Sequence, residues 1–295
     1  MVTSNLDLGA IGVWGHLDSM PAADARAYAR RADELGYGAL WVPETVGREP
    51  FTLLGMLAAE TRRLVLGTSI VSIWGHDAQA TRMAAETLAE ATDGRFVLGL
   101  GVSHPHLASK LRGHDFERPL TRMREYLAAY RAAVYRGPTS TAPSTPILVA
   151  ALRERMTDLA ATEADGVFPY LVTPERVAWM RARLDAAVGE GRPHLAVTLP
   201  VALVGGAEAA RAYLKPYLRT PTYHASWELQ GFEASDWELP GSDRLLDAMV
   251  AIGDVGRARD RIAELKAAGA DHVAIIPLAA DGTTEHIPSL EALAS

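Results

Sequence analysis

Eight short apolar segments, nearly all separated by segments with helical spacing, constrain the fold of this chain more than any other feature. These predicted strands are residues 6–13, 39–42, 64–71, 95–100, 147–151, 166–168, 195–204 and 272–277. Repeated strand-then-helix units imply parallel strands with right-handed crossovers. Eight such units favour a closed (β/α)8 TIM barrel over the alternative, an open doubly wound sheet. We expect a single α/β domain over residues 1–295, with an irregular insertion or lid at about 216–243, after the seventh strand.

The composition excludes several classes of protein. The chain of 295 residues contains no cysteine, so disulfides, thiolate metal sites and cysteine nucleophiles are ruled out. A net charge of −7 argues against a nucleic-acid-binding surface. Residues 1–7 are polar, no signal-type apolar region follows them, and no apolar run reaches the roughly 20 residues that span a bilayer. We therefore expect a cytoplasmic protein with neither a membrane nor a nucleic-acid partner.

The third predicted strand loses bulk at its carboxyl end, where a barrel carries its functional residues. Its apolar start gives way to Gly67, Thr68 and Ser69 before the β-branched Ile70. Small residues at the end of a central strand let another backbone or a flat ligand come close. We expect this strand end to be the back wall of a cofactor site.

The other strand ends do not supply a self-sufficient catalytic set. His104 and His106 could bind a metal only with further ligands, and only His16 and Glu44 are suitably placed. The segment 99–101 lacks the third glycine of a dinucleotide-binding turn. No second strand-end acid supports glycoside hydrolysis, and no serine lies in a nucleophile elbow. The strand ends carry few ionisable groups and many small and aromatic residues. This composition suits a protein that holds an organic cofactor. A metal-dependent hydrolase is the remote alternative.

The segment after the fifth strand could bind an anion. Ala150 to Leu152 lead into a predicted helix whose first turn carries Arg153 and Arg155. Free backbone N–H groups at a helix start and two guanidinium groups together favour a phosphate. The alternative is a solvated turn in which the arginines pair with the nearby acids Glu154 and Asp158.

Aromatic residues are concentrated in and beside the predicted insertion, and they include Tyr223 and Trp227. Aromatic side chains in a loop over a barrel mouth suggest a lid on an apolar substrate. The alternative is ordinary packing within a small subdomain.

Six stretches of the sequence together resemble a known family: LGAIGVW, GYGALWVPE, RLVLGTSIVSIWGHDAQATRMAAETLAEATDGRFVLGLGVSH, RPLTRMREYLAAY, EADGVFPYLVTPERV and GDVGRARDRIAELKAAGADHV. Over essentially its full length the chain resembles the luciferase-like monooxygenase superfamily, and within it the group that uses the deazaflavin coenzyme F420. The resemblance implies hydride transfer between the deazaflavin and a small organic substrate, and a homodimer. It also implies a non-prolyl cis peptide bond between Ser69 and Ile70. Thr45 and His104 depart from the sugar-phosphate dehydrogenase branch, so we do not expect glucose 6-phosphate as the substrate.

Strand-end position and family resemblance together give three sets of site residues. The expected proton donors or acceptors are His104, His16 and Glu44. The expected cofactor-binding residues are Gly67, Thr68, Ser69, Ile70, Val102, Ser103, Ala150, Ala151, Leu152, Arg153, Arg155, Gly166, Phe168 and Pro169. The expected substrate-pocket residues are Trp14, Trp74, Tyr170, Tyr223 and Trp227. The alternatives to an F420-dependent enzyme are an FMN-dependent monooxygenase on the same fold and a non-catalytic barrel that binds a ligand.

Overall fold

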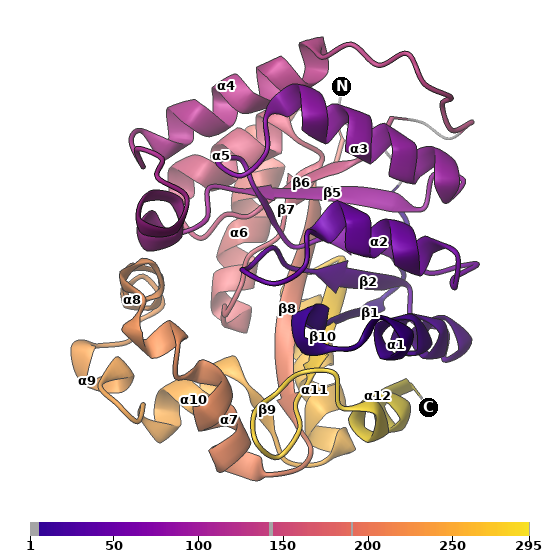
Figure 1. The fold of residues 1–295 in the computed structure, drawn as a ribbon. Helices are drawn as coiled ribbons and strands as arrows, with labels where there is room; N and C mark the ends of the chain where they lie inside the picture. The colour runs from indigo at the N-terminus through magenta and orange to yellow at the C-terminus, as the bar shows by residue number, and fades with distance from the viewer. Residues whose placement is uncertain (1–5, 142–143, 190, 295) are drawn as a thin grey trace.

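Eight parallel strands form a closed barrel in the computed structural model, which describes residues 6–141, 144–189 and 191–294. Over these residues the ring closes because β8 pairs with both β7 and β10, while β10 also pairs with β1 (Figure 1). The barrel strands are β1 (Ile11–Trp14), β2 (Ala39–Val42), β3 (Val65–Thr68), β5 (Phe96–Gly101), β6 (Ile147–Val149), β7 (Gly166–Val167), β8 (His194–Ala202) and β10 (His272–Pro277). The predicted TIM barrel is confirmed, and residues 1–5 of the polar amino-terminal segment lie outside the described part of the chain.

Helices surround this barrel and connect its parallel strands (Figure 1). They are α1 (Ala22–Glu34), α2 (Pro50–Ala58), α3 (Ala78–Ala91), α4 (Pro119–Ala132), α5 (Glu154–Glu163), α6 (Pro174–Ala187), α11 (Val255–Ala267) and α12 (Ile287–Ala294). Several begin with a side-chain cap, as at α3, where the Asp77 carboxylate accepts a hydrogen bond from the Ala80 N–H. No helix among the described residues is both long and apolar enough to cross a lipid bilayer.

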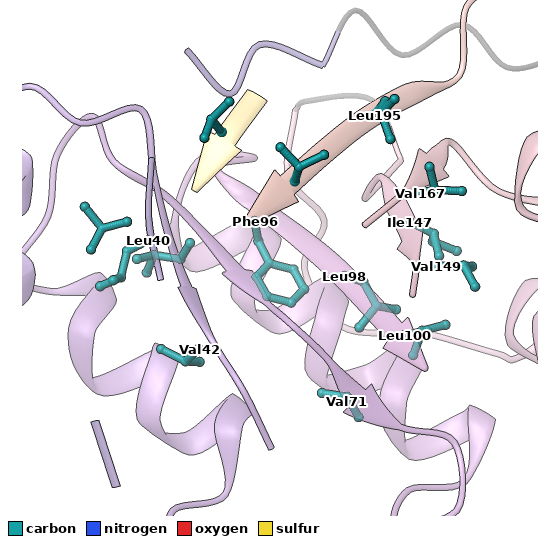
Figure 2. Close-up of a cluster of buried hydrophobic side chains, with 14 of the residues drawn as sticks. Leu40, Val42, Val71, Phe96, Leu98, Leu100, Ile147, Val149, Val167 and Leu195 are labelled. Atoms are coloured by element: carbon teal, nitrogen blue, oxygen red, sulfur yellow. The ribbon is translucent and has the colours of Figure 1, made fainter. Parts of the chain in front are cut away.

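Alternate residues of each strand face two different hydrophobic layers. Leu40 and Val42 of β2 and Leu98 of β5 belong to the layer between the barrel and its helices, part of which is drawn in Figure 2. Their neighbours Trp41 and Val97 belong to a second layer. The alternation follows from the two-residue period of a strand, which turns successive side chains to opposite faces. It explains why the strands read as continuous apolar runs in the sequence.

The second layer is built around a buried pair, Trp41 of β2 and His272 of β10. The Trp41 Nε1–H donates to His272 Nε2 over 3.0 Å, and the other ring nitrogen of His272 lies 2.9 Å from the Gly9 carbonyl oxygen. Two strand glycines make room for these rings. A Cβ at Gly12 would lie 2.5 Å from His272 Nε2, and one at Gly67 would lie 2.3 Å from the Trp41 indole.

The insertion after β8 is more regular than the sequence predicts. It contains α7 (Gly206–Leu214), the 3-10 turn η3 (Tyr217–Arg219), α8 (Pro221–Glu228), α9 (Ala234–Trp237), α10 (Asp243–Met249) and the short strand β9 (Ala251–Ile252). These helices lie together in Figure 1, drawn in shades of orange. Helices were expected over 208–218 and 245–252, but the segment between them was expected to be irregular. That expectation was wrong, because Pro221 lies in the first turn of α8 and a capping box starts α9.

Two other expectations need correction, and two elements were not expected. The first strand begins at Ile11 rather than at residue 6, because Gly9 has a φ of +64°, which breaks an extended run. The helix expected over 245–252 ends at Met249, and its last residues pair with β8 as β9. A π-helical turn, η2 (His106–Leu111), and the last helix α12 were not anticipated.

Candidate active site

A chain of neighbouring aromatic rings, some stacked and some tilted, joins the carboxyl ends of β1, β5 and β7, and we call it the aromatic wall. The wall consists of His106, His104, Tyr223, Tyr170, Trp14 and His16, in that order, with ring centroids 5.4 to 6.4 Å apart at each step. Tyr223 comes from α8 of the insertion, whereas the other members follow barrel strands. Five of the six were predicted site residues, and the fold brings those five together.

His104 is the member of the wall whose ring is least satisfied by the protein. Its Nδ1 is buried and has no hydrogen-bond partner among the described residues. Burial lowers the pKa of His104 to about 4, with a smaller contribution from the neighbouring His106. The ring is therefore neutral at physiological pH, and a buried nitrogen without a partner is available to a ligand.

Residues at the end of β3 differ in burial: Gly67 and Thr68 are buried, whereas Ser69 and Ile70 are half-buried. Gly67 faces the Trp41 indole, and the buried Thr68 hydroxyl is bonded at 2.8 Å to both the N–H and the carbonyl of Gly99. The small size of Gly67 thus makes room for the Trp41 ring in the barrel interior, and its contact with a cofactor stays a prediction. Ser69 and Ile70 are half-buried, and the peptide bond between them is cis, as predicted.

Glu44 lies beside this segment and is held as a carboxylate. Its Oε2 accepts the Ser72 N–H over 2.7 Å, while Oε1 is 3.4 Å from His76 Nε2 and forms an ion pair with Arg112. Burial acts to raise the pKa of Glu44, but His76, Ser72 and Arg112 together outweigh it and lower that pKa. The same contact raises the pKa of His76. This arrangement makes Glu44 a fixed charge rather than a group that exchanges protons near neutral pH.

The backbone of Glu44 also fixes the cis segment. Its N–H donates to the Ile70 carbonyl over 3.2 Å, and Trp14 Nε1–H donates to the Ser69 carbonyl over 3.4 Å. Both carbonyls of the cis pair are therefore held by residues from neighbouring strand ends. His76 and Arg112 were not predicted; His76 lies just beyond the strand end, and the ion pair of Arg112 with Glu44 joins residues 68 positions apart.

The arginines at the start of α5 are free of intramolecular partners. Glu154 and Asp158, the acids expected to compete for them, are both paired with Arg183 of α6 at 2.7 and 2.5 Å. The side chains of Arg153 and Arg155 are exposed and make no hydrogen bond or ion pair within the described chain. The turn thus presents two uncompensated cations at a helix N-terminus.

Arg176 of α6 lies under the same turn and was not predicted. Its guanidinium donates from Nη2 to the Leu152 carbonyl over 2.7 Å, while its Nε is buried without a partner among the described residues. Ala150 and Leu152 are half-buried, and Ala151 is buried. The predicted anion turn therefore rests on a buried cation that has an unused donor.

The remaining predicted site residues fall into two groups: one lies at the barrel mouth, and the other contacts packed protein. Trp74 Nε1–H donates to the Val102 carbonyl over 2.8 Å, next to Ser103, whose φ is +56°. By contrast, Phe168 packs edge-on against Trp41, and a Cβ at Gly166 would meet the His194 backbone at 2.0 Å. Trp227 is fully buried inside the insertion, and Pro169 is buried as well. The second group contacts packed protein: Gly166 through the pairing of β7 with β8, Phe168 through Trp41, and Trp227 within the insertion.

Tyr170 of the aromatic wall shares a hydroxyl cluster with two tyrosines of the insertion. Its hydroxyl is hydrogen-bonded to that of Tyr213 and lies 3.1 Å from that of Tyr217. Burial raises the pKa of all three tyrosines. The cluster ties the insertion to the end of β7 and keeps these phenols protonated.

A carboxyl group near His16 was missed by the sequence analysis. Glu285 follows β10 and accepts a hydrogen bond from the His16 N–H over 2.5 Å. On the other side, His16 Nε2 is 3.2 Å from the Thr45 hydroxyl, which is hydrogen-bonded to Asp18. The signal that could have found Glu285 is its place after the last strand, because every strand end of a barrel contributes to the mouth.

Two other features do not mark a site. A groove of about 520 Å³ lies between α5 and α6, lined by residues such as Trp179 and Arg183. It is on the outer helices, away from the strand ends, so we do not place the active site there. The described residues contain no group of three or more histidine, aspartate or glutamate side chains arranged to hold a metal ion.

Comparison with known proteins identifies relatives over the whole chain. A family model described as luciferase-like monooxygenase matches residues 2–272. A Mycobacterium tuberculosis protein provisionally named a coenzyme F420-dependent oxidoreductase is 26% identical, with 96% of this chain and 97% of that protein aligned. A 5,10-methylenetetrahydromethanopterin reductase from Archaeoglobus fulgidus is 27% identical over 55% of this chain and 54% of its own length.

Solved structures share the fold at lower sequence identity. An F420-dependent secondary alcohol dehydrogenase, bound to an F420–acetone adduct, has a TM-score of 0.77 at 13% identity, with 97% of each chain covered. An FMN-bound type II Baeyer–Villiger monooxygenase component from Pseudomonas putida has a TM-score of 0.70 at 14% identity, with 97% of this chain and 95% of that one covered.

Proposed function

Because the chain belongs to the luciferase-like monooxygenase family, we propose that it is an F420-dependent oxidoreductase that transfers a hydride between the deazaflavin and a small organic substrate. The relative that aligns with nearly the whole chain is named for F420, which favours this coenzyme over FMN. When bound, the coenzyme would supply the hydride chemistry, and the protein would supply binding, orientation and proton handling.

One structural observation carries the proposal: Arg153 and Arg155 are free while both neighbouring acids pair with Arg183. A phosphate at the start of α5 would receive backbone N–H groups and two guanidinium groups. The buried, unused Nε of Arg176 fits the same assignment, because a bound anion nearby would compensate that buried cation. We assign this turn to the phosphate of the coenzyme.

The ring system would then lie toward the half-buried cis segment. Ser69 and Ile70 would form its back wall, with Val102, Ser103 and Ala150 beside it. The proposed role of Glu44 is to position this segment, since its backbone N–H holds the Ile70 carbonyl and its carboxylate holds the Ser72 N–H.

The aromatic wall would line the substrate side. Trp14, Tyr170 and Tyr223 offer flat apolar faces, which suit an apolar or modestly polar substrate. His104 would hold a polar group of the substrate at the β5 end of the wall, because a neutral ring with a buried nitrogen that has no partner among the described residues can donate or accept one proton. We propose that residues 216–243 act as a lid, because Tyr223 of α8 covers His104 while Trp227 supports Tyr223 from behind.

The decisive experiment is a titration of the purified protein with F420 and with FMN, followed by tryptophan fluorescence. We expect F420 to quench the fluorescence at about micromolar concentration and FMN to bind at least about tenfold more weakly. Tighter binding of FMN would instead favour an FMN-dependent monooxygenase, and binding of neither would favour a non-catalytic barrel. A homodimer remains a prediction, which light scattering on the same sample tests.

A further inference from the structure

We propose that Glu285 is the proton donor of this site, and that it delivers a proton to the oxygen of a carbonyl substrate at the β1 end of the aromatic wall. The inference rests on the proposed function and adds to it a residue from the loop after β10. The starting observation is that a carboxyl group lies at the rim of the barrel without any cationic side chain bonded to it among the described residues.

The position of Glu285 is fixed by the end of β1. Its Oε1 accepts the His16 N–H over 2.5 Å, and the hydroxyl of the preceding residue, Thr284, lies 3.2 Å from the same nitrogen. A Cβ at Gly15 would lie 3.6 Å from the Glu285 Cγ, so the aliphatic part of the Glu285 side chain packs over Gly15. The contact is to backbone, and the position of the carboxyl therefore does not depend on the His16 imidazole.

The backbone of Glu285 is also unusual. Its φ is +69°, in the left-handed region that a residue with a side chain rarely adopts. Such conformations persist where the surroundings hold them, and they are concentrated at functional sites. Here the conformation places the carboxyl against the β1 end.

The groups that face Glu285 favour its protonated form. Asp18 of η1 (Leu17–Ser19), His16 and Tyr28 of α1 are the titratable neighbours, and Asp18 repels a second negative charge. Burial, with a smaller contribution from Asp18, raises the pKa of Glu285 to about 8, although the His16 N–H opposes the shift. Glu285 as a residue is half-buried rather than fully enclosed, which leaves a route for its proton to exchange with water.

The hydride, with its two electrons, would be supplied by the reduced deazaflavin of the proposed function, which is oxidised in the same step. It would attach to the carbonyl carbon of the substrate while the π electrons of the C=O bond move to the oxygen. The O–H bond of Glu285 breaks as the O–H bond of the product alcohol forms. The Glu285 carboxylate then recovers a proton from solvent, and the oxidation of an alcohol reverses each step. A carboxylic acid that is still protonated at neutral pH is a better donor for this step than the neutral His104 ring.

The test compares Glu285→Gln with the wild-type protein and with a matched control, Glu291→Gln, an exposed α12 residue paired with Arg31. Glutamine keeps an acceptor for the His16 N–H but cannot supply a proton. In protein labelled with 13C at the glutamate carboxyl carbons, we expect one resonance to titrate near pH 8 in wild type and in Glu291→Gln, and to be missing in Glu285→Gln. Reduction of cyclohexanone with reduced F420 should fall about a hundredfold in Glu285→Gln, and Glu285→Asp should restore part of it.

Each outcome decides one claim. In Glu285→Gln, we expect F420 binding within about twofold of wild type and a turnover rate that no longer falls above about pH 8. This combination would support Glu285 as the proton donor. A Glu285 carboxyl that titrates in the ordinary range, or a Glu285→Gln variant with the wild-type pH profile, would overturn it while leaving the proposed function intact. If the wild-type protein binds neither F420 nor FMN, the proposed function fails and the proton donor falls with it.

Discussion

The fully buried His272 in the barrel interior and the half-buried His104 at the barrel mouth differ in their hydrogen bonds, although the pKa of each is lowered by the same effect. Burial lowers the pKa of each to about 4. His272 has partners at both ring nitrogens, the Trp41 N–H and the Gly9 carbonyl. His104 has a buried Nδ1 without a partner among the described residues. A low pKa by itself therefore does not distinguish a structural histidine from one available to a ligand, whereas the state of its hydrogen bonds does.

The largest effect should come from breaking the interior pair. Trp41→Ala removes a fully buried indole and leaves His272 Nε2 without its donor. We expect the free energy of unfolding to fall by about 3 to 5 kcal/mol, measured by urea unfolding. Trp179→Ala, which removes a half-buried indole on α6, should cost less than half as much. Equal losses in the two variants would contradict the assignment of Trp41 to the core.

At the mouth, the same kind of truncation should affect activity rather than stability. His104→Ala should lower turnover with reduced F420 about a hundredfold, or about 2.7 kcal/mol in the barrier, with unfolding changed by less than about 1 kcal/mol. Steady-state kinetics and urea unfolding measure the two quantities. His106 lies at the exposed outer end of the wall, so His106→Ala serves as the comparison and should lower turnover less than about threefold. Full turnover in His104→Ala would remove the distinction between the two histidines.

We expect a loss of stability of intermediate size at Glu44, whose carboxylate interacts with His76 and Arg112 at the barrel mouth. Glu44→Gln should destabilise the protein by about 2 kcal/mol at pH 6, because it leaves Arg112 without its counter-charge. The lowered pKa of Glu44 gives stability above its unfolded pKa, and this stability is lost as pH falls through the folded pKa. The raised pKa of His76 adds stability that is lost as pH rises through its folded pKa.

Urea unfolding of Glu44→Gln at several pH values tests this window. The difference from wild type should be largest between the two transitions and should shrink in acid, whereas Glu125→Gln, at the exposed Arg122–Glu125 pair of α4, should show little difference at any pH. A constant difference across the range would argue against an ionised Glu44.

The smallest effect should come from the surface of the mouth. Arg153→Gln and Arg155→Gln should each weaken F420 binding about tenfold, or about 1.4 kcal/mol, and leave unfolding unchanged, because neither side chain has an intramolecular partner among the described residues. Fluorescence titration measures the binding, with the exposed Arg259→Gln as the control. Stronger binding in either variant would show that the arginines crowd the phosphate turn instead of holding it.

The sequence alone determined the order of strands and helices, and with it the barrel and the edge where the site lies. These features depend on local signals: apolar runs, helical spacing, and the residues that end each element. The place of the cis bond at Ser69–Ile70 was also predicted, on the strength of the family resemblance.

The tertiary structure decided what each candidate residue contacts within the protein. Gly67 and His104 both follow from strand-end reasoning, yet Gly67 faces Trp41, whereas His104 Nδ1 has no partner among the described residues. Such contacts join distant positions: Trp41 and His272 are 231 residues apart, and His16 and Glu285 are 269 apart. Burial and hydrogen bonding depend on every element packed around a side chain, and a local pattern in the sequence does not contain that information.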